Sequence, residues 1–184
     1  MAIDESLIDR TGRLLNAARY LNMATTRDGT PWVATLEYAW FAEPLRLVFG
    51  SSTGSRHSGD IRREPRVSGS LFVTAGAEGV PIASVDGAQF TGRCTEVRPD
   101  QLQEYGTPFY ETVFPDARQR EEWRLPPELL QPPALHRLYL IDVERWWLID
   151  TRTWAEDRVD RRVEVPLDPA TQALLSARTR DGAA

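Results

Sequence analysis

The chain has 184 residues, of which 41% are hydrophobic and 27% charged, and its formal net charge is −5. This size and composition are typical of one soluble globular domain, so we expect a single domain over residues 1–184. The acidic balance argues against nucleic acid and anionic membranes as partners, and we see neither an apolar run of membrane-spanning length nor a signal-peptide pattern.

All 22 basic residues are arginines, which excludes a lysine nucleophile or Schiff base. The chain has one cysteine, Cys94, and two histidines, so we expect neither a disulfide framework nor a metal site. These counts favour a cytoplasmic location. Cys94 itself is expected to be a small buried hydrophobic residue.

Apolar periodicity and turn residues divide the first half of the chain. In chain order we predict a helix at about 4–22, strands at 23–27, 32–41 and 45–49, a helix at 56–63, and a strand at 67–74. The Asp28-Gly29 turn should join the first two strands into an antiparallel hairpin, and Glu64-Pro65 should end the second helix.

The second half of the chain continues the strand pattern around a helical insert. We predict one or two strands within 82–97 with a bulge or bend at Gly87, an insert at about 99–130, strands at 135–143, 145–150 and 158–165, a helix at 169–177, and disorder at about 178–184. In the adjacent Trp146 and Trp147, strand alternation should send the two rings to opposite faces. The chain is therefore expected to be mainly β (α+β), as a small antiparallel barrel of six or seven strands with peripheral helices.

Hydroxyl and basic side chains gather where strand 45–49 meets the helix at 56–63. Ser51, Ser52 and Ser55 precede Arg56 and His57 at the start of that helix. Free backbone N–H groups, hydroxyls and an arginine fork together make an anion site, for which phosphate is the simplest ligand. The alternative is an ordinary strand–turn–helix with Ser55 as its N-cap.

Several segments occur in an order that is similar to a known family. These are MATTRDGTPWVAT (23–35), GSSTGSRH (50–57), RREPRV (62–67) and QFTGRCTEV (89–97). Over about residues 14–150 the chain resembles the pyridoxamine 5′-phosphate oxidase-like proteins, which are flavin-binding split β-barrels. The resemblance implies a homodimer that binds FMN at the subunit interface, with residues from both chains in each site.

The resemblance also implies roles for individual residues. The family's phosphate motif falls on Ser55, Arg56 and His57, where His57 replaces the usual lysine, and Ser51 and Ser52 lie just upstream, near the phosphate or ribityl chain. The further cofactor-binding positions are Val33, Ala34, Thr35 and Leu36 against the isoalloxazine ring, Gln89 across the dimer interface, and Trp147, or Trp146, at the border of the ring. No catalytic residue is assigned.

The two histidines are weighed differently. For His57 we expect FMN affinity to weaken as the pH rises through the pKa of the bound imidazole, because phosphate favours the protonated form. His136 is expected to be structural. The insert at 99–130 is interpreted either as a lid over a substrate site or as a cover for the barrel.

The segment after Asp150 has no clear match to the family's C-terminal substrate-binding arginine and histidine elements. We therefore expect an FMN-dependent oxidoreductase acting on an unidentified small molecule. Three alternatives stay open: a deazaflavin-dependent reductase, a haem-binding or haem-degrading split barrel in which His57 or His136 ligates iron, and a non-enzymatic FMN-binding protein.

Overall fold

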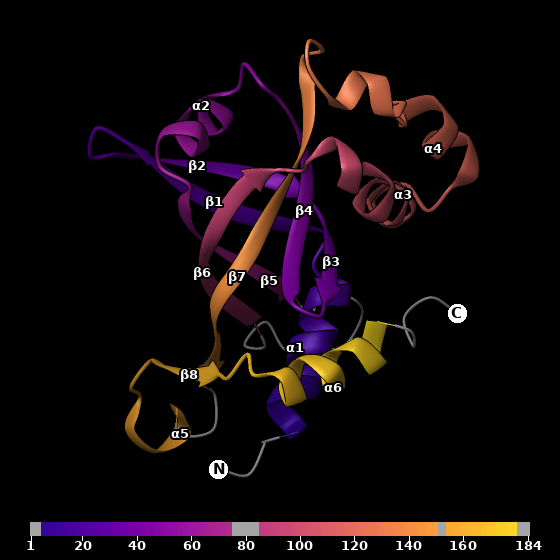
Figure 1. Ribbon diagram of the computed structural model, residues 1–184. Coiled ribbons are helices and arrows are strands. Elements are labelled where there is room, and N and C mark those ends of the chain that lie inside the picture. Colours follow the sequence, from indigo (N-terminus) through magenta and orange to yellow (C-terminus); the bar gives the residue numbers. More distant parts are fainter. Residues whose placement is uncertain (1–4, 75–84, 151–153, 180–184) are drawn as a thin grey trace.

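A computed structural model describes residues 5–74, 85–150 and 154–179, which form one antiparallel sheet with helices around it (Figure 1). The eight strands are β1 (Tyr20–Arg27), β2 (Thr30–Glu37), β3 (Ala39–Ala42), β4 (Leu45–Ser52), β5 (Arg66–Thr74), β6 (Val85–Glu96), β7 (His136–Asp150) and β8 (Arg161–Val165). They are hydrogen-bonded in the order β2-β1-β5-β6-β7-β4-β3, with β8 paired to the end of β7. Because β2 and β3 are the two edges of this path yet adjacent in sequence, the sheet curls into a split barrel.

Six helices of the described chain lie around the barrel. They are α1 (Glu5–Ala17), α2 (Arg56–Arg63), α3 (Leu102–Val113), α4 (Ala117–Trp123), α5 (Trp154–Asp157) and α6 (Pro169–Thr179), with short 3₁₀ turns η1 (Pro99–Gln101) and η2 (Pro127–Leu130). Figure 1 shows α2 beside β1 and β2 at one end of the barrel, α1 and α6 together at the other end, and α3 and α4 to one side. The expected fold class, a mainly β split barrel with peripheral helices, is confirmed, with one strand more than the largest number expected.

The first hairpin forms as expected. Asp28 and Gly29 have φ values of 50° and 74°, the left-handed pair that a tight two-residue turn requires, and Arg27 pairs with Thr30. The N-terminal helix, however, ends at Ala17 and not near residue 22. Leu21, which we assigned to the helix, belongs to β1, where it points into the barrel interior together with Met23.

Two further boundaries differ from the predictions because pairing partners decide them. The strand expected at 32–41 is two strands, since β2 pairs with β1 whereas β3 pairs with β4. Between them Tyr38 is buried and its hydroxyl donates to the Leu15 carbonyl oxygen at 3.1 Å. Conversely, the strands expected at 135–143 and 145–150 are one continuous strand, β7, because β6 pairs along nearly its whole length.

The bulge in β6 also lies elsewhere than predicted. The register between β6 and β7 shifts at Thr91/Gly92, and Gly87 lies within the regular pairing of β6 with β5. Of the region expected to hold this strand, residues 82–84 lie outside the described part of the chain. The same is true of residues 180–184 of the predicted disordered tail, whereas α6 continues to Thr179.

The barrel interior is the main hydrophobic core. Its fully buried side chains include Leu21, Met23, Leu47, Phe49, Phe90, Cys94, Tyr139, Ile141, Trp146 and Leu148. Cys94 is buried as predicted, and burial raises the pKa of its thiol. Trp146 stacks on Phe90 inside the barrel, while Trp147 lies on the opposite face of β7, as strand alternation predicted.

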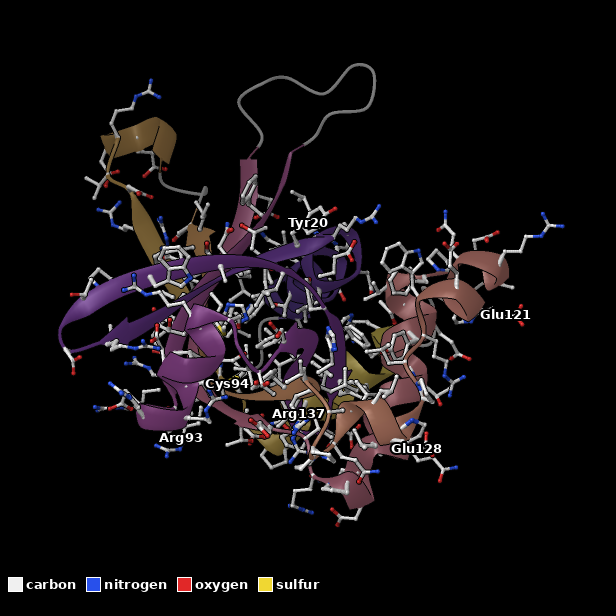
Figure 2. All side chains as sticks on the ribbon, turned by 90° about the horizontal axis from the view of Figure 1, so that it is seen from above. Tyr20, Arg93, Cys94, Glu121, Glu128 and Arg137 are labelled. Atoms are coloured by element: carbon white, nitrogen blue, oxygen red, sulfur yellow. The ribbon has the colours of Figure 1, made fainter. Side chains whose placement is uncertain are left out.

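A second core lies between the barrel and the insert. Tyr105, Phe109 and Tyr110 of α3 are buried against Val48 of β4 and Leu138 of β7. α3 therefore covers the outside of the barrel, whereas α4 has no buried residue. In Figure 2, seen from above, Glu121 of α4 lies at the outer edge of the insert, away from the barrel.

At the other end, α1 and α6 pack on each other and on the barrel. Ile8 of α1 and Leu175 of α6 are buried together, and Arg178 Nε donates to Asp9 Oδ1 at 2.6 Å. Arg10 fixes α1 to β6 through a bond from its Nε to Asp86 Oδ2 of 2.8 Å. No helix in the described part of the chain is long and apolar enough to cross a membrane.

Candidate functional site

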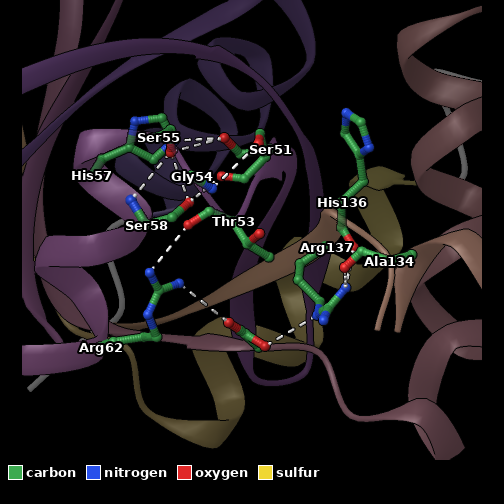
Figure 3. Close-up of polar contacts among 12 residues, drawn as sticks. Ser51, Thr53, Gly54, Ser55, His57, Ser58, Arg62, Ala134, His136 and Arg137 are labelled. Atoms are coloured by element: carbon green, nitrogen blue, oxygen red, sulfur yellow. Dashed lines mark hydrogen bonds and ion pairs between the residues drawn. The ribbon is translucent and has the colours of Figure 1, made fainter. Parts of the chain in front are cut away.

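The loop from β4 to α2 is organised by serine hydroxyls (Figure 3). Ser55 is the N-cap of α2, and its Oγ accepts a hydrogen bond from the Ser58 backbone N–H at 3.3 Å. Ser58 Oγ donates to the Ser52 carbonyl oxygen at 2.8 Å, and Ser52 Oγ accepts from the Gly54 N–H at 3.2 Å. These bonds fix the turn and hold the start of α2 against the end of β4.

His57 lies inside this hydroxyl cluster. Its Nε2 is 2.8 Å from Ser51 Oγ and 3.1 Å from Ser55 Oγ, and the imidazole is only 8% exposed. Burial lowers the pKa of His57, and this outweighs the opposite effect of the Asp60 carboxylate. In the ligand-free protein at neutral pH, His57 is therefore a neutral group that orients two hydroxyls.

Arg56 carries the positive charge at the start of α2. Its guanidinium lies over the Trp32 ring, with the Cζ atom 4.8 Å from the ring centroid, and its side chain is 39% exposed. Among the described residues, the two terminal nitrogens of Arg56 have no hydrogen-bond acceptor, and neither do the backbone N–H groups of Arg56 and His57. These donors are the groups from which an anion site can be built.

Two residues that the sequence analysis did not single out stand beside this cluster. Asp60, one turn along α2, is fully buried, and Arg27 at the end of β1 forms an ion pair with it. The position of Asp60 four residues after Arg56 is visible in the sequence, because such residues share one helix face. The approach of Arg27 is not, because it depends on how α2 packs on β1.

The second histidine lies near the same loop. His136 at the start of β7 pairs with Ser52 of β4, is exposed, and in Figure 3 points away from the neighbouring Arg137. Arg137 is buried and forms an ion pair with Glu96, Nε to Oε2, at 3.3 Å. Of the two imidazoles, only that of His136 lies open to an external ligand.

The residues predicted to meet a flavin ring lie on β2, next to Arg56. Val33 and Thr35 point to the outer face of the sheet, where Val33 is 59% exposed and Thr35 Oγ1 donates to Asn22 Oδ1 at 2.8 Å. Ala34 and Leu36 point to the inner face, opposite Met23 and Leu21. Trp32, which contacts Arg56, alternates with Val33, so the anion cluster and the outer-face side chains lie on the two sides of the edge strand β2.

Gln89 and Trp147 share this outer face but lie across the sheet. The cross-strand partners run from Thr35 through Asn22, Ser70 and Gln89 to Trp147. Gln89 Oε1 accepts from Arg162 Nε at 2.9 Å, and the Arg145 guanidinium carbon lies 4.6 Å from the centroid of the Trp147 ring.

Within one chain, Gln89 and Trp147 are not brought to the serine cluster. Three strand spacings separate Gln89 from Thr35, which is roughly 14 Å. Trp147 lies eleven positions along β7 from His136, the partner of Ser52, or roughly 36 Å along the strand. The predicted site residues therefore form two groups: the serine–histidine–arginine cluster with β2, and the pair on β6 and β7.

A cavity of about 980 Å³ lies elsewhere, between α1, β3 and α3. Its walls include Trp40, Phe41, Arg46, Glu104 and Tyr105. None of the predicted cofactor-binding residues lines it, so the cavity is separate from the serine cluster. Among the described residues, no group of three or more histidine, cysteine or acidic side chains is placed to hold a metal ion.

Comparison with known proteins places this geometry in a family. The sequence pattern of the family described as pyridoxamine 5′-phosphate oxidase matches residues 8–150. A UPF0306 protein of Pasteurella multocida is 29% identical over 82 residues, which is 45% of this chain and 52% of that protein. The chain thus aligns with about half the length of this curated relative.

Solved structures show the same fold at low sequence identity. A haem-binding protein of Mycobacterium smegmatis superposes with a TM-score of 0.64 and 13% identity, over 96% of this chain and 62% of that one. A FAD-binding protein of Mesorhizobium loti superposes with a TM-score of 0.52 and 21% identity, over 76% of this chain and 90% of that one. General Stress Protein 26 of Bacillus anthracis superposes with a TM-score of 0.54 and 17% identity, over 86% of this chain and 98% of that one. With its family pattern matched from α1 to the end of β7, this chain belongs to the pyridoxamine 5′-phosphate oxidase family.

Proposed function

We propose that this protein binds FMN and acts as an FMN-dependent oxidoreductase on a small molecule. The observation that carries the proposal is the set of unused donors at the start of α2, beside the Ser51 and Ser55 hydroxyls, in a chain of this family. The Arg56 guanidinium and the backbone N–H groups of Arg56 and His57 fit a terminal phosphate group.

The flavin ring would lie against β2. From the start of α2 the ribityl chain would pass Trp32 toward the exposed backbone and side chains of Val33 and Thr35. When bound, FMN supplies the redox chemistry, by accepting and donating electrons at its ring. The protein's own part is to hold the phosphate with Arg56, to orient Ser51 and Ser55 through His57, and to support one face of the ring.

The proposal includes a homodimer, because one chain leaves the ring covered on one side only. Exposed apolar side chains lie on the outer face of the sheet, among them Tyr20 (48%), Val33 (59%) and Phe72 (53%). An apolar sheet face of this kind is suited to burial against a second copy. In such a dimer, Gln89 and Trp147 of the partner subunit would approach the ring held by β2.

The absorption spectrum of the purified protein tests the proposal, recorded alone and after addition of FMN. We expect the two visible bands of a bound flavin, and their loss in Arg56→Ala. Failure of the wild-type protein to take up FMN would overturn the proposal. Reduction of the bound flavin by NADH or NADPH then separates an oxidoreductase from a non-enzymatic flavin-binding protein.

A second candidate is haem binding, which the likeness to the mycobacterial haem-binding fold and the exposure of His136 favour. His57 is less suited to ligate iron, because its Nε2 is engaged by two serine hydroxyls. Addition of haemin to the same protein tests this candidate. An intense haem band that disappears in His136→Ala would support it, and a spectrum unchanged by that substitution would count against it.

A further inference from the structure

We propose that Arg27 is a second anion-binding residue of the α2 site, held next to Arg56 by the buried carboxylate of Asp60. This inference rests on the proposed phosphate-binding function of the α2 start, and it adds a residue from β1 to that site. Neither the motif at 55–57 nor the family resemblance assigned a role to Arg27.

The carboxylate of Asp60 is the centre of the arrangement. It is fully buried, and Arg27 Nε lies 2.6 Å from its Oδ1. The other oxygen, Oδ2, accepts a hydrogen bond from Thr25 Oγ1 at 2.9 Å and lies 3.8 Å from Arg56 Nε. A buried carboxylate is costly unless it is paired, so Asp60 constrains both arginines.

Arg27 also packs directly on the first turn of α2. Its Nη2 lies 3.4 Å from the Arg56 carbonyl oxygen. At Gly59, a Cβ atom would come within 2.6 Å of the same Nη2, so the guanidinium lies directly against the backbone of the helix. The Arg27 side chain is nevertheless 36% exposed, and it can therefore reach a ligand.

The charges of the three side chains leave an excess of one positive charge. Both arginines turn Nε toward Asp60, and Nη2 of Arg27 bonds the Arg56 carbonyl oxygen, so Nη1 of Arg27 and both terminal nitrogens of Arg56 remain for a ligand. Two guanidinium groups that face the same carboxylate match the two negative charges of a terminal phosphate better than Arg56 alone. Asp60 is thus a positioning residue, and Arg27 and Arg56 are the binding residues.

FMN and riboflavin, which differ by the phosphate group, separate this role from a structural one. Dissociation constants for both are measured by flavin fluorescence in wild-type protein, Arg27→Ala and Arg27→Lys. Loss of a charge-assisted hydrogen bond weakens binding by roughly 10- to 100-fold. We expect that loss for FMN in Arg27→Ala, partial recovery in Arg27→Lys, and less than about a two-fold change for riboflavin throughout.

Two further variants complete the experiment. Arg63→Ala is the matched control, because Arg63 is also on α2 but is 67% exposed, with its Nη1 3.9 Å from Asp28 Oδ2. The FMN affinity of the Arg63→Ala variant should not change. Arg27→Ala leaves the Asp60 carboxylate buried without its closest cation. The double variant Arg27→Ala, Asp60→Asn removes that charge and should show the same selective loss of FMN affinity.

The outcomes are distinct from those of the proposed function. Unchanged FMN affinity in Arg27→Ala, or an equal loss for FMN and riboflavin, overturns the inference. If wild-type protein binds no FMN, the proposed function fails, and inorganic phosphate then tests the arginine pair. A rise of the melting temperature with phosphate that is lost in Arg27→Ala supports the pair, and no rise in wild-type protein overturns it.

Discussion

The imidazole Nε2 of His57 lies 2.8 Å from the hydroxyl oxygen of Ser51. This contact joins the first turn of α2 to the end of β4, where His57 is buried, and burial lowers the pKa of His57 below the ordinary value. His57 thus differs from a lysine at the same position, which would be charged at neutral pH. The contact leads to a prediction about stability.

The stability of the ligand-free protein should depend on the ionisation of His57. Because the folded-state pKa is lowered, the unfolded chain binds more protons below about pH 6.5, the ordinary value for histidine. His57 therefore contributes stability that is fully present above that pH and is lost as the pH falls. Urea unfolding from pH 5 to 8 should give a steeper loss for wild-type protein than for His57→Gln. His136→Gln, at the exposed histidine, should keep the wild-type slope, and a slope shared by all three proteins would contradict the prediction.

Two glycines should respond oppositely to alanine. At Gly92, beside the bulge of β6, a Cβ atom would meet the backbone oxygen of Asp142, which cannot move without disrupting β7. Gly92→Ala should therefore cost at least about 2 kcal/mol of unfolding free energy. At Gly106, inside α3, a Cβ atom would make an ordinary 3.7 Å contact with Leu138, so Gly106→Ala should stabilise by about 0.5–1 kcal/mol. Equal effects of the two substitutions in chemical denaturation would refute this reasoning.

The insert should contribute to stability through α3 and not through α4. Phe109→Ala removes a ring that is 6% exposed in the core between α3 and the barrel, and should cost about 3–5 kcal/mol. Trp123 of α4 stacks on Phe114 but is 61% exposed, so Trp123→Ala should cost less than about 1 kcal/mol. Thermal unfolding measures both, and a small effect of Phe109→Ala would mean that the insert does not stabilise the barrel.

The outer face of the sheet should carry the proposed dimer. Phe72→Glu places a charge on an exposed apolar position of that face, opposite Gly87 of β6. Sedimentation analysis should show a dimer for wild-type protein and a shift to monomer for Phe72→Glu. Trp123→Glu, at an exposed aromatic residue on the insert, should remain dimeric. A monomeric wild-type protein would refute the use of this face for self-association.

Much of the local structure could be predicted from the sequence because it depends on neighbouring residues. The Asp28-Gly29 hairpin, α2 with its Ser55 cap and its end before Pro65, and the opposite faces of Trp146 and Trp147 follow from turn chemistry, capping and strand alternation. The order of the motifs also indicated the family. These features need no knowledge of what packs against them.

Other features were decided by contacts between distant segments. Leu21 belongs to β1 and not to the first helix because its neighbours on β2 and β5 pair with it, and the break at Tyr38 arises because β2 and β3 have different partners. A local pattern contains no information on such pairing, since an apolar residue suits a helix stripe and a strand face equally.

The chemistry of the candidate site divides in the same way. The sequence determined by itself that serines, an arginine and a histidine would gather at the start of one helix. Only the tertiary structure decided that His57 is buried and neutral, that Arg27 reaches the helix from β1, and that Gln89 and Trp147 lie across the sheet from β2. The physical reason is that side-chain identity and helix caps depend on adjacent residues, whereas burial, ion pairing and pKa depend on what folding brings into contact.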